Sequence, residues 1–99
     1  MTDMETRSRI MERVEKLESR FEERYGLFSK TEEKKCFYVN DEEYFMVTGL
    51  ASLGGIVIEH ALSKREAERN MFEDGDLFYM DELDEDAMFE AMIREIEDN

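Results

Sequence analysis

Few side chains in this sequence could perform nucleophilic or acid–base chemistry. His60 is the only histidine and Cys36 the only cysteine. A nucleophilic cysteine needs a base beside it, and two predicted strands and a turn separate these two residues. Gly49 and Gly54–Gly55 match the spacing of neither common phosphate-binding loop. We therefore expect no catalytic residue and no enzymatic activity.

Carboxylates are abundant, and their oxygens could bind a hard cation such as Ca²⁺ or Mg²⁺. A calcium loop needs acids at its first, third and fifth positions and a glycine at its sixth. After Asp74, however, Gly75 comes second and Phe78 stands where the fifth position lies. Pairs of carboxylates also catalyse glycoside hydrolysis, but almost any two acids in this chain fit that description. The sequence thus predicts no dedicated metal site and no cofactor.

The most informative property is the distribution of charge along the chain. The formal net charge is −14 at pH 7. Residues 1–25 carry seven acids and six bases, residues 26–72 carry eight and six, and residues 73–99 carry twelve acids and only Arg94. The last segment alone therefore has a net charge of −11. Nucleic acids and anionic membranes are themselves negative, so we expect neither as a partner.

Length and composition predict one domain that spans residues 1–99. Hydrophobic residues make up 41% of the 99 residues, enough for a core and too many for a disordered acidic tail. The single cysteine excludes an internal disulfide. The apolar runs at 45–47 and 55–58 are far too short to span a bilayer, and no signal sequence is recognisable. We therefore expect a cytoplasmic protein.

The first 25 residues have the pattern of an amphipathic helix. Thr2 and Glu5 have capping-box spacing at its start, and Gly26 is a typical helix stop. One apolar stripe recurs at helical spacing, made of Ile10, Val14, Leu17, Phe21 and Tyr25. Such a stripe packs on the core of the domain or, alternatively, on a coiled-coil partner.

The middle of the chain has the pattern of strands. Residues 27–33 read as a connection, and 34–39 and 44–50 as two strands joined by a turn at Asn40–Asp41. The run 56–58 follows a glycine-rich turn and predicts a third strand. Short connections between neighbouring strands predict a three-stranded antiparallel meander.

A shorter helix and an ambiguous segment come next. Ser63 and Glu66 form a second capping box, which predicts a short helix to about residue 72 that ends at Asp74–Gly75. The apolar run 77–80 is either a short fourth strand or a loop packed on the core.

The last element is a second amphipathic helix. Asp84 is its predicted N-cap, with Leu83 and Met88 placed as a hydrophobic staple. The expected buried face consists of Met88, Phe89, Met92, Ile93 and Ile96. The predicted fold class is therefore α+β: a long N-terminal helix, a three-stranded antiparallel meander, a short helix, a short fourth strand and a C-terminal helix.

The acidic last quarter mixes carboxylates with aromatic residues, a composition typical of recognition surfaces. A field of one sign accelerates association with an oppositely charged partner. The alternative is a solvated face that serves only solubility. The expected partner-binding residues are Glu73, Asp74, Asp76, Phe78, Tyr79, Asp81, Glu82, Asp84, Glu85 and Asp86, with Phe78 and Tyr79 as anchors.

Residues 66–81, which contain Phe-Glu-Asp-Gly-Asp-Leu-Phe at 72–78, and residues 86–93 resemble the small acidic α+β immunity proteins of bacterial polymorphic toxin systems. The strand expected at 56–59 fits the same likeness, which covers about residues 55–97. The resemblance implies a protein that binds and neutralises a toxin, and many such toxins are nucleases with basic substrate channels.

The leading hypothesis is therefore an immunity-type inhibitor that neutralises a basic toxin through its acidic C-terminal region, as a monomer or weak homodimer. The alternative is a dimeric regulatory or adaptor domain that pairs through a sheet edge or its first helix.

Overall fold

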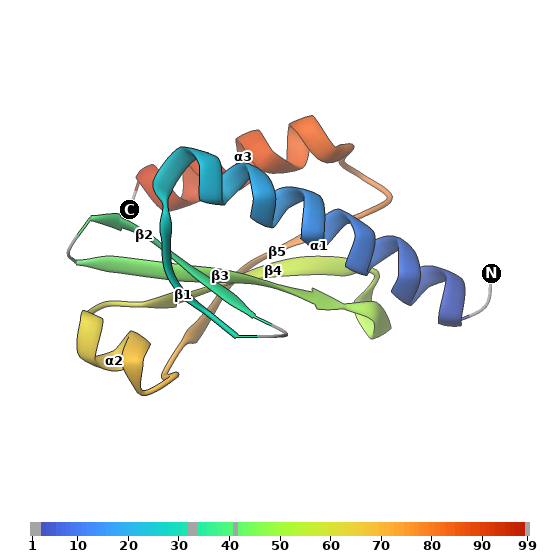
Figure 1. The fold of residues 1–99 in the computed structure, drawn as a ribbon. Coiled ribbons are helices and arrows are strands. Elements are labelled where there is room, and N and C mark those ends of the chain that lie inside the picture. Colours follow the sequence, from blue (N-terminus) through green and yellow to red (C-terminus); the bar gives the residue numbers. More distant parts are fainter. Residues whose placement is uncertain (1–2, 32–33, 41, 99) are drawn as a thin grey trace.

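The computed structural model describes residues 3–31, 34–40 and 42–98. In chain order the elements are α1 (Asp3–Tyr25), β1 (Leu27–Lys30), β2 (Lys35–Asn40), β3 (Glu43–Leu50), the 3₁₀ helix η1 (Ala51–Leu53), β4 (Gly55–Ala61), α2 (Lys64–Glu68), β5 (Glu73–Tyr79) and α3 (Glu85–Glu97). The strands form one five-stranded sheet in sequence order, and every neighbouring pair is antiparallel. Helices α1 and α3 cover one face of this sheet, and α2 lies against one end of the other face (Figure 1).

In the first helix, the predicted apolar stripe faces the core. Ile10, Val14, Leu17 and Phe21 are all buried in the main core. Because the domain's own sheet covers this stripe, the stripe is not available as a coiled-coil face. Gly26 has a φ of 102°, which only glycine adopts readily, and its N–H donates to the carbonyl of Glu22. The capping box predicted at Thr2 lies outside the described residues.

The sheet has two strands more than the predicted meander. Residues 27–33 are not only a connection, because residues 27–30 form β1 and pair with β2, with Leu27 opposite Phe37. The predicted third strand is also longer, since β4 extends from Gly55 to Ala61. A four-residue strand carries too little periodicity to be recognised in a sequence, and pairing with β2 decides its structure.

The second helix is shorter than predicted. It ends at Glu68, because Asn70 adopts a left-handed φ of 57°. The N–H of Asn70 donates to Ala67 and that of Met71 to Glu66, which is the Schellman arrangement that satisfies the last carbonyls of a helix. The prediction that Asp74–Gly75 ends this helix is wrong, since both residues belong to β5. Residues 77–79, left open between strand and loop, pair with β4 as part of β5.

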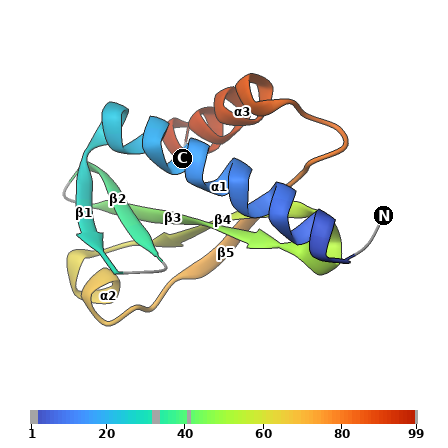
Figure 2. The same ribbon diagram turned by 45° about the vertical axis from the view of Figure 1, so that its right-hand side comes forward.

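The last helix agrees with its prediction. The Asp84 carboxylate accepts a hydrogen bond from the N–H of Ala87 at 2.8 Å and caps α3. Met88, Phe89, Met92 and Ile96 are buried between α3, α1 and the sheet. Figure 2 shows both long helices on the same side of the sheet. Within the described part of the chain, no helix is both long and apolar enough to cross a membrane.

Candidate protein-binding surface

The strand β5 carries the first acids of the predicted patch. It lies at the edge of the sheet, where β4 is its only neighbour. Glu73, Asp74 and Asp76 are exposed on it. The strand is irregular at this point, because the register with β4 shifts between Val57 and Glu59. A shift of this kind re-aims the side chains on the bulged strand.

The turn after β5 carries two further acids, Asp81 and Glu82, both exposed. Backbone hydrogen bonds hold the turn at both ends. The N–H of Met80 donates to Gly54 at 3.0 Å, and the N–H of Glu82 donates to the carbonyl of Tyr79 at 3.2 Å. The guanidinium of Arg13 on α1 donates to the carbonyl of Leu83 at 2.6 Å. The two carboxylates are therefore presented by an anchored backbone.

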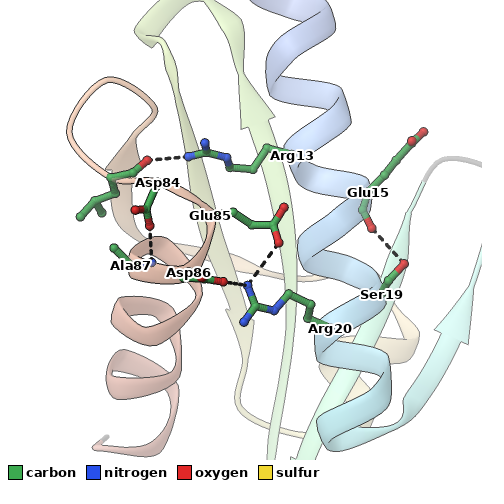
Figure 3. A network of polar contacts seen from close by, with 9 residues as sticks. Arg13, Glu15, Ser19, Arg20, Asp84, Glu85, Asp86 and Ala87 are labelled. Atoms are coloured by element: carbon green, nitrogen blue, oxygen red, sulfur yellow. Dashed lines mark hydrogen bonds and ion pairs between the residues drawn. The ribbon is translucent and has the colours of Figure 1, made fainter.

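The remaining three acids of the predicted patch are engaged within the chain (Figure 3). Asp84 caps α3. The Arg20 guanidinium on α1 lies 2.9 Å from the carboxylate of Asp86 and 3.3 Å from that of Glu85. It also lies over the Phe89 ring at 4.1 Å, a cation–π contact. Glu85 and Asp86 thus attach α3 to α1, whereas Asp84 serves α3 alone, and only part of the charge of the three acids remains for a partner.

The two predicted anchors have different environments. Phe78 is half-buried and packs against the main core beneath the long helices. Tyr79 is 43% exposed. Adjacent strand residues point to opposite faces of a sheet, so only one member of this pair can face outward. Tyr79 is therefore the accessible anchor, and Phe78 holds β5 onto the core.

The exposed acids lie on a surface that is poor in bases. No lysine or arginine occurs in residues 36–63, which include β3, η1 and β4, or in residues 70–93, which include β5 and the turn. Among the described residues, no ion pair joins Glu73, Asp74, Asp81 or Glu82 to a base. These four carboxylates are therefore left without an ion-pair partner in the part of the chain that the structure describes.

The sequence reasoning missed a cluster of titratable groups under α3. Nδ1 of His60 lies 3.6 Å from a carboxylate oxygen of Glu43, and Nε2 lies 3.8 Å from Glu95. Both separations are too long for a hydrogen bond. Burial lowers the pKa of His60, against the opposing influence of Glu43 and then Asp76. Burial also raises the pKa of Glu43 and of Glu95.

This cluster has a structural task in the strand that carries the patch. Glu95 accepts a hydrogen bond from the N–H of Asp76 at 3.0 Å, so α3 holds the irregular part of β5. A Cβ on Gly75 would lie 2.9 Å from the backbone carbonyl oxygen of Ile58 and 2.9 Å from the Glu95 carboxylate, which disfavours any larger residue there. No group of three metal-ligating side chains with suitable geometry occurs in residues 3–31, 34–40 and 42–98.

Two other features of the molecule, a cysteine and a cavity, lack the properties of a reactive or charged site. Cys36 is buried on the face of the sheet opposite α3, and burial raises the pKa of its thiol to about 11, so it is a poor nucleophile at neutral pH. A cavity of about 660 Å³ lies between α1 and the ends of β2 and β3. Its lining includes Glu15, Glu18, Lys34 and Lys35, so acids and bases are balanced there.

The geometry thus narrows the predicted patch to an anchored acidic surface formed by β5 and the turn after it. No protein-family model, curated protein or solved structure matches the chain.

Proposed function

We propose that this protein is a binding protein that inhibits a basic partner, in the manner of an immunity protein that neutralises a toxin. The observation that carries the proposal is the set of exposed acids Glu73, Asp74, Asp81 and Glu82, which have no ion-pair partner in the described chain and belong to a segment, residues 70–93, without lysine or arginine. Uncompensated charge of one sign opposes the compact state. Binding a cationic surface removes that cost.

Some acids of the predicted patch form ion pairs within the chain and others do not, and this difference supports the same proposal. Glu85 and Asp86, which attach α3 to α1, form ion pairs with Arg20. Acids on β5 and the turn have no such partner in the described chain, although backbone hydrogen bonds hold their positions. A charged surface on a fixed backbone suits recognition, because little ordering is needed on binding.

Electrostatic attraction of this kind chiefly accelerates association. Steering raises the association rate constant by about 10- to 1,000-fold at low ionic strength, and salt removes most of the gain. An inhibitor of a toxin made in or near its own cell benefits from rapid capture. A nuclease is the favoured class of target, because a channel that binds nucleic acid is itself basic.

Co-expression tests this function directly. Each reading frame on either side of this one is expressed alone and together with the chain. The proposal expects one product that stops growth alone, permits growth with the chain, and purifies with it as a stoichiometric complex. If neither product is toxic and neither forms a complex, the immunity-type function is wrong.

A further inference from the structure

The register of the sheet determines which side chains share the face that α2 touches. Opposite residues of an antiparallel pair point to the same side, and successive residues alternate. Tyr44 is opposite Ala61, and both pack with α2 and its flanks in the second apolar cluster. Along β4, Val57 and Glu59 precede Ala61 at alternate positions and therefore lie on this same α2 face.

The same reasoning extends to β5. Glu59 is opposite Asp74, and Val57 is opposite Leu77. Tyr79 is opposite Gly55 and continues the row. A Cβ on Gly55 would lie 3.0 Å from a methyl group of Leu77, so Leu77 occupies the space above this glycine. Asp74, Leu77 and Tyr79 thus lie side by side on the α2 face.

The helix α2 covers only one end of this face, where β4 runs into it (Figures 1 and 2). Among the described elements, no helix lies over the other end, where β3 leads into η1 and β5 into the turn (Figures 1 and 2). Tyr79 is 43% exposed there, and Leu77 beside it is half-buried. Apolar side chains at a bare sheet surface are typical of a contact region.

The charged side chains that β4, β5 and the turn contribute beside these apolar side chains are all negative, and the bases of α2 lie at the other end of the face (Figure 1). Glu59 and Asp74 lie on the face itself, and Asp81 and Glu82 follow Tyr79 in the anchored turn. The segments 36–63 and 70–93 that form this part of the molecule contain no lysine or arginine. An aromatic anchor within a rim of one charge is complementary to a basic protein surface.

Charge disfavours one other mode of binding, and backbone hydrogen bonds disfavour a second. A second copy of this chain would bring one acidic face against another, and each copy has a net charge of −14. An added strand would need the outer backbone groups of β5. The carbonyl of Tyr79 is already bonded by Glu82 and Leu83, and the N–H of Asp76 by Glu95, so part of this edge is occupied.

We propose that the uncovered half of the α2 face, formed by β3, β4 and β5, docks the basic protein partner, with Tyr79 and Leu77 as apolar contacts and with Glu59 and Asp74, at the margin of α2, as the adjoining charges. This inference rests on the proposed function and deepens it. It moves the centre of the site from the whole acidic tail to one face of the sheet, and it adds Glu59, which lies outside the acidic quarter of the sequence.

Amide chemical shifts test the location. The ¹⁵N-labelled chain is titrated with pancreatic ribonuclease A, a basic nuclease used as a probe, at low and at high ionic strength. The largest shifts are expected at Val57, Glu59, Asp74, Leu77 and Tyr79, and salt should abolish them. If the largest shifts occur on α1 or α3, or are spread over all surfaces, the proposed docking face is wrong. The proposal of a basic partner would still stand.

Matched variants test the contacts with the same probe. Tyr79→Ala is compared with Tyr38→Ala, since Tyr38 is 38% exposed on the same face but at the end near α2. Glu59→Gln with Asp74→Asn is compared with Glu12→Gln with Glu15→Gln on α1. The first member of each comparison should weaken binding about 3-fold or more, and the second less than about 2-fold. Equal effects within both comparisons overturn the assignment.

Two outcomes distinguish a failure of this inference from a failure of the proposed function. No binding of the probe at low ionic strength counts against the basic partner and therefore against both proposals. Shifts on the predicted face that grow with the concentration of the chain alone, without probe, identify a second copy as the occupant and overturn the docking of a basic partner.

Discussion

The two faces of the sheet use acidic residues in opposite ways. On the face covered by α1 and α3, carboxylates have arginines beside them, as Arg24 lies 2.9 Å from Glu97 and Arg20 lies 2.9 Å from Asp86. On β5 and the adjoining turn, the exposed acids Glu73, Asp74, Asp81 and Glu82 form no ion pair within the described chain. The comparison teaches that net charge alone does not reveal a site. What distinguishes a binding surface is charge that the fold leaves without a partner.

The largest difference in unfolding free energy is expected between substitutions of aromatic residues on the two faces. Phe21 is completely buried and contacts the rings of Phe37, Phe45 and Phe89. Phe21→Ala should lower the free energy of unfolding by about 3–5 kcal/mol, because it leaves a cavity in the core. Tyr79→Ala should change it by less than about 0.5 kcal/mol. Urea denaturation measures both, and a comparable loss for Tyr79 would show that the α2 face carries stability rather than recognition.

A smaller effect is expected where an acid of the predicted patch serves the fold. Asp84→Ala removes the N-cap of α3 and should cost about 1 kcal/mol of unfolding free energy. Asp81→Ala is the matched control three residues earlier, and it should be nearly neutral because Asp81 is exposed in the turn. Thermal unfolding of the two variants compares them. Equal losses would mean that the turn acids also hold the structure.

The ion pairs between α1 and α3 should contribute less to the free energy of unfolding than the N-cap of α3 does. Arg20→Gln removes the contacts with Glu85 and Asp86 and the cation above Phe89. Because these side chains are partly exposed, the loss should be at most about 1 kcal/mol and should shrink as salt is added. Arg65→Gln on α2 serves as the control. An undiminished loss in high salt would assign the effect to packing on Phe89 instead of charge.

The smallest expected effect concerns the buried acid of the helix-covered face. Glu18 is 8% exposed, and burial raises its pKa despite the nearby Lys35. A raised pKa means that the folded state disfavours the carboxylate, so this cost is present at neutral pH and is relieved as the pH falls through the folded pKa. Glu18→Gln should therefore be slightly more stable than the parent at pH 7 and equal to it near pH 4. Denaturation at both pH values tests this, with Glu15→Gln on the exposed side of α1 as control. A loss of stability at pH 7 would mean that the pair with Lys35 outweighs burial.

Local patterns made much of the fold predictable. Both long helices follow from apolar spacing and from caps that involve neighbours in the sequence, as at Gly26 and Asp84. The first part of β5 was missed because Glu-Asp-Gly-Asp has low strand propensity. Pairing with β4 and the hydrogen bond to Glu95 hold it in the sheet. Such long-range contacts leave no local signal.

The candidate site was predictable only in outline. Charge counting located the acidic quarter, but it could not separate acids that bind arginine from acids that do not. Arg20 and Asp86 are 66 positions apart in the sequence, and their pairing depends on how α1 and α3 pack. Glu59 was missed for the same reason, because only the register of β4 and β5 brings it beside Asp74.

The most direct test compares two ways of removing the same charge. One variant combines Glu73→Gln, Asp74→Asn, Asp81→Asn and Glu82→Gln, and the other combines Glu12→Gln, Glu15→Gln, Glu23→Gln and Glu68→Gln. The association rate constant with the toxic partner found by co-expression is measured at low ionic strength. The first variant should associate about 10-fold or more slowly and the second within about 3-fold of the parent. Equal slowing of both variants would show that only net charge matters and would contradict a localised acidic binding surface.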